Sequence, residues 1–202
     1  MGGVSSRSIH GQFKPLVPRV LGWLGGGKMW PVEGLRTRQR LCGVPEHHDA
    51  TGTCHIIDAG GHIDYIHESL DGCLRGLSVR VQEWQPKWKV WPFNSFTLRT
   101  RGRRLVDVEL EHLARTLTAP DEGLLRPAYH IHAYMRDGQV DAIGMVRTAD
   151  LVRYVLAPPI GSPSAPPQPS GNGANNFVWV GWDDLTAAGI TIRSWVRREM
   201  AA

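Results

Sequence analysis

The tract from Trp84 to Arg104 combines aromatic rings with positive charge. Its sequence, WQPKWKVWPFNSFTLRTRGRR, holds three tryptophans, two phenylalanines and six lysines or arginines, and it contains no acid. Aromatic rings can stack on nucleic-acid bases while cations neutralise phosphates. The tract carries a charge of +6 and the whole chain +4, so the other residues together carry −2. This concentration of positive charge is typical of a nucleic-acid-binding surface.

We therefore predict that this tract binds nucleic acid, with DNA favoured over RNA. The tryptophans would stack on bases and the cations would contact phosphates; the residues are Trp84, Lys87, Trp88, Lys89, Trp91, Arg99, Arg101, Arg103 and Arg104. One alternative is a protein-interaction strip that binds a protein partner or a second copy of the chain, because Trp and Arg also dominate protein contacts. Another is a strand pair with solvated cations and tryptophans in the core.

A second group of candidate ligands lies between Cys42 and Cys73. All three cysteines and five of the nine histidines fall in this stretch. Zinc accepts thiolate and imidazole together, so four of these residues could close a tetrahedral site. The candidate zinc ligands are Cys42, His47, Cys54 and His55. Their spacing matches no standard zinc finger, and the alternative is that they are solvated loop residues.

Two further patterns could bind phosphate or move protons. The run Gly22–Met29 nearly spells a phosphate-binding loop, but Met29 replaces the expected Ser or Thr and no amphipathic helix follows, so we interpret it as chance. His130 and His132 lie on one face of an expected strand, because side chains alternate along a strand. They could act as general bases, metal ligands or nucleic-acid contacts, or the face could point to solvent or be covered by a helix.

The elements that would position these residues fall into two parts. Residues 1–53 are rich in Gly, Pro and Arg without sustained periodicity, which predicts an irregular N-terminal arm. Residues 54–202 alternate short β-type runs with helical patterns, which predicts an α/β (or α+β) core domain with a central mixed β-sheet flanked by helices. Within this domain, residues 158–176 form a Pro/Gly/Ser-rich loop.

Several elements of the core domain have individual signals. Short β-type runs predict strands at 54–58, 63–66, 77–82 and 96–99, with a turn at Gly60-Gly61 between the first two. An apolar stripe predicts a helix at about 103–118. Asp137-Gly138 predicts a hairpin between strands at 129–135 and 139–146. Thr148 is expected to cap a helix through Leu156. A strand at 177–180, a helix at 182–188 and a C-terminal surface helix complete the expected order.

This order of three strands, a long helix and further strands resembles the core of the PD-(D/E)xK nuclease superfamily. The resemblance implies a restriction-endonuclease-like core and a divalent-metal-dependent phosphodiesterase. In that family an acid on the second strand and an acid-x-lysine on the third hold Mg²⁺ and activate water. Here the resemblance assigns the metal-binding acids to Asp64, with Asp58 as its rival, and Glu83.

The third-strand motif departs from the family pattern. Arg80-Val81-Gln82 occupies its natural position, and Glu83-Trp84-Gln85 is the nearest alternative, with glutamine where lysine is expected. Lys87 takes the lysine role only if the backbone turns back at Pro86. The resemblance therefore leaves open a nuclease with a degenerate active site, which binds nucleic acid without cutting it.

Composition sets the remaining expectations. The chain has 202 residues, of which 42% are hydrophobic, which suits one globular domain with its own core. No apolar stretch approaches the roughly 18 to 20 residues needed to cross a bilayer. Three cysteines, an odd number, argue against a disulfide framework and favour a cytoplasmic location.

Overall fold

The computed structural model describes residues 9–32, 63–83, 95–101, 127–157, 168–169 and 176–197. These residues form an α+β fold with two sheets, one of six strands and one of three. The coarse fold class and the mixed central sheet expected from the sequence are therefore confirmed. The strand expected at 54–58 with Asp58, the helix expected at 103–118, the zinc ligands and most of the loop at 158–176 lie outside the described residues.

The N-terminal segment differs from the irregular arm expected for residues 1–53. It forms α1 (Ile9–Phe13), the 3₁₀ helix η1 (Lys14–Leu16), α2 (Val17–Trp23) and β1 (Lys28–Pro31). Phe13, Leu16 and Val20 are spaced by three and four residues and are all buried, so they form one apolar face. Each helix is too short to show a period in the sequence, which is why the arm interpretation is wrong for residues 9–31.

The larger sheet contains β1 and five further strands: β2 (Tyr65–Glu68), β3 (Leu74–Glu83), β5 (Pro127–Arg136), β6 (Gln139–Arg147) and β9 (Ile192–Val196). Their order is β1-β2-β3-β5-β6-β9. Neighbouring strands are antiparallel except for β3 and β5, which are parallel. The expected hairpin is confirmed, because Asp137 and Gly138 both have positive φ angles, as a two-residue turn requires.

The smaller sheet and two helices cover one side of the larger sheet. They are β4 (Ser95–Arg101), β7 (Gln168–Pro169), β8 (Asn176–Gly181), α6 (Thr148–Leu156) and α7 (Trp182–Ala187). The small sheet has the order β4-β8-β7. The helix through Leu156 is confirmed, but Thr148 is its first helical residue and Arg147 occupies the cap position, with no side-chain cap bond. The capping role expected for Thr148 is therefore wrong.

The C-terminal segment is also corrected by the structure. Residues 192–196 were expected in a surface helix, but they form β9 and pair with β6. Ile192 and Trp195 are spaced by three residues, which resembles a helical pattern in the sequence. Residues 192–196 are extended instead, because they pair with the edge of β6. Two apolar residues spaced by three form too short a pattern to distinguish a helix from a strand.

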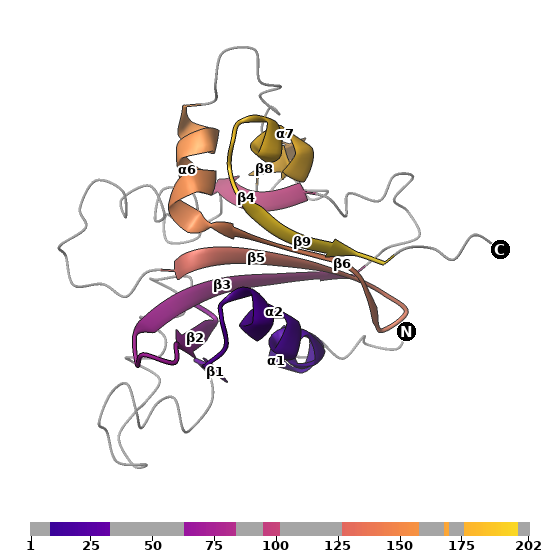
Figure 1. Cartoon of the computed structure of the whole chain (residues 1–202). Helices are drawn as coiled ribbons and strands as arrows, with labels where there is room; N and C mark the ends of the chain where they lie inside the picture. The colour runs from indigo at the N-terminus through magenta and orange to yellow at the C-terminus, as the bar shows by residue number, and fades with distance from the viewer. Residues whose placement is uncertain are drawn as a thin grey trace.

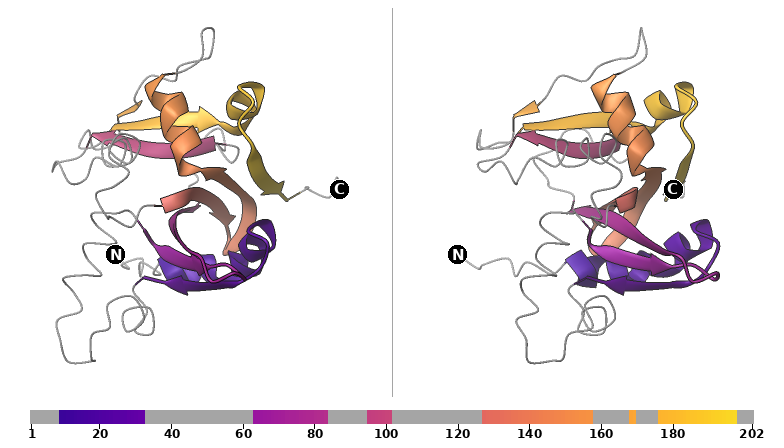
Figure 2. Two further views of the ribbon diagram at one scale, coloured as in Figure 1. Left: turned by 60° about the vertical axis from the view of Figure 1, so that its left-hand side comes forward. Right: turned by 90° about the vertical axis from the view of Figure 1, so that its left-hand side faces the viewer.

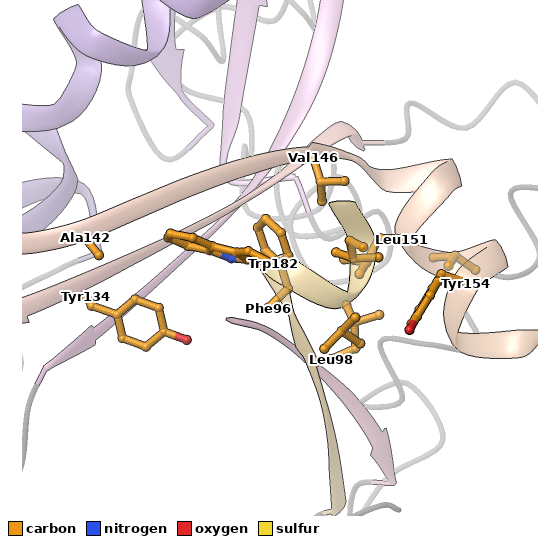
Figure 3. Close-up of a cluster of buried hydrophobic side chains, with 11 residues drawn as sticks. Phe96, Leu98, Tyr134, Ala142, Val146, Leu151, Tyr154 and Trp182 are labelled. Carbon is orange, nitrogen blue, oxygen red and sulfur yellow. The ribbon is translucent and has the colours of Figure 1, made fainter. Parts of the chain in front are cut away.

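The two faces of the six-stranded sheet are covered by different layers (Figures 1 and 2). One face, which we call the α1–α2 face, packs against α1, η1 and α2. The other, the β4–β8 face, packs against β4, β8, α6 and α7. Figure 3 shows the centre of this second layer, where Trp182 and Phe96 lie together between Ala142 and Leu151. No helix among the described residues is long and apolar enough to cross a membrane.

Candidate functional site

Polar residues of β3 and β5 lie side by side on the β4–β8 face of the sheet. Ser78 pairs in register with His130, and Arg80 pairs with His132. Neighbouring strands are about 4.8 Å apart, and residues at i and i+2 share a face. These four residues therefore form a compact polar group, with Gln82 and Tyr134 as the next pair along the strands.

Asp64 lies at the edge of this group. Its N–H donates to the carbonyl of Leu77 over 2.9 Å. Its half-buried carboxylate accepts the N–H of Val79 through Oδ2 at 2.6 Å. Asp64 thus extends the β2–β3 ladder by one side-chain hydrogen bond and lies level with Ser78. The structure thus places Asp64 directly before β2 and next to β3.

Glu83 lies far from Asp64. It is exposed and pairs with Met135, at the opposite end of β3. Four residues of strand separate it from Val79, the backbone partner of Asp64, which corresponds to about 13 Å. Strand alternation also assigns positions 79 and 83 to the α1–α2 face. The structure does not bring Asp64 and Glu83 together, so the metal pair inferred from the resemblance is corrected.

The tyrosine of the polar group is tied to β4. Tyr134 donates its hydroxyl hydrogen to the carbonyl of Ser95 at 2.9 Å, and its oxygen lies 3.0 Å from Ser95 Oγ. The ring of His132 stacks on that of Tyr134, with centroids 4.4 Å apart and planes inclined by 23°. His132 Nδ1 lies 3.4 Å from the tyrosine hydroxyl. These contacts fix the edge of β4 above the end of β5.

Burial and charge hold this group in its neutral form. Burial raises the pKa of Tyr134 to about 12, although the hydrogen bond to Ser95 and the charge of Arg80 act in the opposite direction. Burial also lowers the pKa of His132 well below its usual value, and the charges of Arg80 and His130 lower it further. At neutral pH, His132 is therefore an uncharged base and Tyr134 an uncharged hydroxyl.

The histidines are covered rather than open to solvent. His130 and His132 are both fully buried, and the ring of Phe96 from β4 packs edge-on against His130 with centroids 5.9 Å apart. The prediction that this strand face is covered is therefore confirmed, although the covering layer includes strand β4 and not helices alone. A fully buried imidazole cannot touch a large substrate directly. Among Ser78, Arg80, His130 and His132, only Arg80 is half-buried rather than buried.

The metal predictions have different outcomes. Magnesium prefers several oxygen ligands, but the residues of β3 beside Asp64 are Ser78 and Arg80. No group of three or more His, Cys, Asp or Glu side chains suited to a metal occurs among the described residues. The described part of the proposed magnesium site therefore does not fit this ion. Lys87 and the four zinc candidates Cys42, His47, Cys54 and His55 lie outside the described residues, so zinc stays a prediction.

The glycine run near the N-terminus does not have the arrangement of a phosphate-binding loop. Gly25, Gly26 and Gly27 follow the C-terminal end of α2, and Lys28 opens β1. A phosphate site needs the N-terminus of a helix, where free N–H groups point outward. The loop has a packing role instead: His67 Nε2 lies 2.8 Å from the carbonyl of Gly26.

The basic aromatic tract is anchored at two points beside the polar group. Its first part leaves β3 after Glu83 and re-enters the described residues at Ser95, the first residue of β4. Both anchors lie at the same end of β5, because Glu83 pairs with Met135 and Ser95 bonds to Tyr134. Most of its predicted nucleic-acid contacts lie outside the described residues: Trp84, Lys87, Trp88, Lys89, Trp91, Arg103 and Arg104.

Two of the predicted cations, Arg99 and Arg101, are placed in β4. They pair in register with Phe177 and Asn176 of β8, with an irregularity between them.

Sequence reasoning missed Ser78, Tyr134 and Ser95 as members of the polar group, and treated Arg80 only as a departure from the expected motif. The available signal was the i, i+2 alternation, which groups Tyr134 with the two histidines.

No family model, curated protein or solved structure matches the chain. The function is therefore inferred from the residues and their geometry.

Proposed function

We propose that this protein binds nucleic acid through the basic aromatic tract, on a core of the restriction-endonuclease-like type. The observation that carries the proposal is the position of the tract. The tract, with a charge of +6, leaves β3 after Glu83 and returns to the described residues at Ser95. Both of these residues lie at the same end of β5, next to the polar group of β3 and β5. Phosphates attracted by the tract would therefore meet Arg80, the half-buried cation of that group.

The strand order supports the choice of core. β1, β2 and β3 form an antiparallel meander, and β5 then joins β3 in parallel. In the PD-(D/E)xK superfamily, which the sequence resembles, the second-strand acid and the third-strand motif lie on a meander of this kind. Asp64, directly before β2, occupies the position of that acid.

The third strand favours binding over cleavage. Arg80 and Gln82 occupy the natural position of the expected acid-x-lysine, so a guanidinium and an amide replace the carboxylate and the amine. Ser78 is the residue of β3 that lies level with Asp64. A serine does not supply the negative charge with which clustered acids hold a divalent cation. Arginine keeps its charge at any physiological pH and forms paired hydrogen bonds with phosphate oxygens. The group suits recognition of a phosphate better than activation of water.

The salt dependence of binding tests the proposal. Anisotropy of a fluorescent DNA should give an affinity that falls log-linearly with salt concentration, because bound cations displace counterions. The double variant Lys87→Ala/Lys89→Ala should lower the slope by about 1 to 2, since each phosphate contact contributes roughly 0.7 to 0.9. Lys14→Ala/Arg147→Ala removes the same charge from exposed positions outside the tract and should leave the slope unchanged. Absence of binding at low salt, or equal effects of the two double variants, would contradict the proposal.

A cleavage assay separates binding from catalysis. DNA and RNA are incubated with the protein in Mg²⁺ or Mn²⁺, beside Asp64→Ala and Glu83→Ala. We expect binding without cleavage. Cleavage that is lost in Asp64→Ala but kept in Glu83→Ala would instead show a working site around Asp64. Cleavage that survives both substitutions would place the chemistry elsewhere.

A further inference from the structure

β9 is an edge strand whose outer side is open. It is the last strand of the six-stranded sheet, and within the described part of the chain it pairs with β6 alone. In the left view of Figure 2 it is the yellow strand at the border of the sheet. Its outer backbone groups form no hydrogen bond with the rest of the described chain, and Arg193, Ser194 and Val196 are exposed. An open edge of this kind is a template for pairing with another strand.

The register with β6 decides which backbone groups of β9 point outward. Arg197 donates its N–H to the carbonyl of Asp141 over 2.7 Å, and the two residues are directly opposite each other in the ladder. Hydrogen-bonded and non-hydrogen-bonded pairs alternate in an antiparallel ladder. Arg193 and Trp195 therefore also direct their N–H and C=O groups to β6. The outward-directed backbone groups belong to the residues between them: Ile192, Ser194 and Val196.

The side chains of β9 are complementary to those of a second, antiparallel copy of the strand. About a two-fold axis at Ser194, Ile192 lies opposite the partner's Val196, which joins two apolar residues and covers a side chain that is 42% exposed. Arg193 lies opposite the partner's Trp195 in a non-hydrogen-bonded pair, where side chains across the ladder are closest. Each contact occurs twice, as an isologous interface requires.

The cations of this edge lie opposite or beside groups other than each other. Arg193 would face an indole rather than a second Arg193, and Arg197 lies 3.8 Å from the carboxylate of Asp141 in its own chain. The guanidinium carbon of Arg19 lies 4.1 Å from the ring centroid of Trp195, which holds the indole in place. The opposite edge is less suited to pairing, because β1 has four residues and ends in Pro31.

From these observations we propose that β9 is a homodimer interface, through which the six-stranded sheets of two copies form one continuous sheet. A second copy is the occupant that matches both the outward backbone groups and the side chains of this strand. Because a strand of five residues buries little area, the dimer is expected to be weak and reversible rather than obligate. This inference does not depend on the proposed function.

Sedimentation velocity on the full chain, washed free of nucleic acid at high salt, tests the dimer from low micromolar to several hundred micromolar protein. Ser194→Pro removes an outward N–H and leaves the groups that bond to β6 intact, as proline on an edge strand allows. It should raise the dissociation constant of the dimer at least about 10-fold, whereas Ser194→Ala, which keeps the N–H, should not change it. Val196→Lys places a charge opposite the partner's Ile192 and should also weaken the dimer. Leu156→Lys, at a 54% exposed position on α6, is its matched control.

Hydrogen exchange locates the interface in the unmodified chain. The amides of Ile192, Ser194 and Val196 should exchange more slowly at high than at low protein concentration, while those of Arg193 and Trp195 are protected at both. A monomer throughout the concentration series would overturn the inference. A dimer that neither Ser194→Pro nor Val196→Lys weakens would also overturn it, because its interface would lie elsewhere. If circular dichroism shows that Ser194→Pro is misfolded, Val196→Lys and the exchange pattern decide.

Discussion

The two faces of the six-stranded sheet are both largely buried but differ in chemistry. On the α1–α2 face, β2, β3 and β5 present Tyr65, Leu77, Val79, Ile131 and Ala133 to the N-terminal helices. On the β4–β8 face, the alternate residues of β3 and β5 are mostly polar: Ser78, Arg80, His130, His132 and Tyr134. Burial of polar groups costs free energy unless they find partners. Sheet formation alone would be served better by apolar residues at these positions.

The polar character of the second face stops at one strand boundary. Each row of the sheet continues from β5 into β6, where the residues paired with His130, His132 and Tyr134 are Val146, Gly144 and Ala142. The polar group is therefore confined to β3 and β5 with Asp64 at its edge, on the side of the sheet where the basic tract is anchored. Because the polar residues are confined to these two strands, we interpret them as a candidate site rather than as ordinary structural packing. Four substitutions test this difference between the two faces.

The largest effect is expected on the apolar face. Phe13→Ala removes a fully buried ring that packs on Tyr65, with centroids 5.1 Å apart, so the free energy of unfolding should fall by about 3–5 kcal/mol. Urea unfolding followed by circular dichroism measures it. Leu156→Ala, at an exposed position, should change it by less than about 0.5 kcal/mol. A loss below about 1 kcal/mol for Phe13→Ala would mean that the N-terminal helices contribute little to the sheet.

The second effect concerns the apolar end of the β4–β8 face. Gly144 lies under the indole of Trp182, and a Cβ added there would overlap the ring. Gly144→Ala should therefore destabilise the protein by about 3 kcal/mol, near the upper end of the usual cost of overpacking. Gly22→Ala is the control, because it lies in α2 with open space around it and should stabilise slightly. Equal unfolding midpoints for the two variants would contradict this packing.

The third effect probes the polar group directly. Tyr134→Phe leaves the Ser95 carbonyl without its buried hydroxyl donor, which should lower the free energy of unfolding by about 2 kcal/mol. Tyr129→Phe on the same strand is the control, because Tyr129 is half-buried and its hydroxyl makes no hydrogen bond to the described residues. If both variants lose the same stability in urea, the bond between β5 and β4 does not hold the polar group in place.

Local signals predicted the parts of this arrangement that depend on near neighbours. Asp137-Gly138 predicted the β5–β6 hairpin, and alternation predicted that His130 and His132 share a face. The short N-terminal helices were missed, because segments of three to seven residues do not show a helical period. Their burial depends on a sheet assembled from distant residues, which no local pattern reveals.

The sequence pointed to Asp64 but did not reveal the residues that surround it in the structure. Asp64 was chosen because it lies within the run expected as the second strand, whereas Glu83 was chosen because it is the nearest acid in the sequence to the expected motif. The register of the β2–β3 ladder decides the question: it puts Asp64 beside Leu77 and Val79. That register depends on the hairpin at residues 69–73, and the pairing of β3 with β5 depends on a still more distant segment.

The smallest effect is the pH dependence that His132 adds to stability. Its folded-state pKa is lowered by burial, then by Arg80 and His130, so between that value and about 6.5 the unfolded chain binds the extra proton. Stability should therefore fall as the pH drops below about 6.5, by up to about 1.4 kcal/mol per pH unit. In His132→Gln this contribution is absent. Urea unfolding from pH 7.5 to 5 should thus show a steeper acid loss for the wild type. If the free energies of unfolding of the wild type and His132→Gln fall in parallel with pH, His132 is hydrated in the folded protein. The polar face is then less dry than the apolar face.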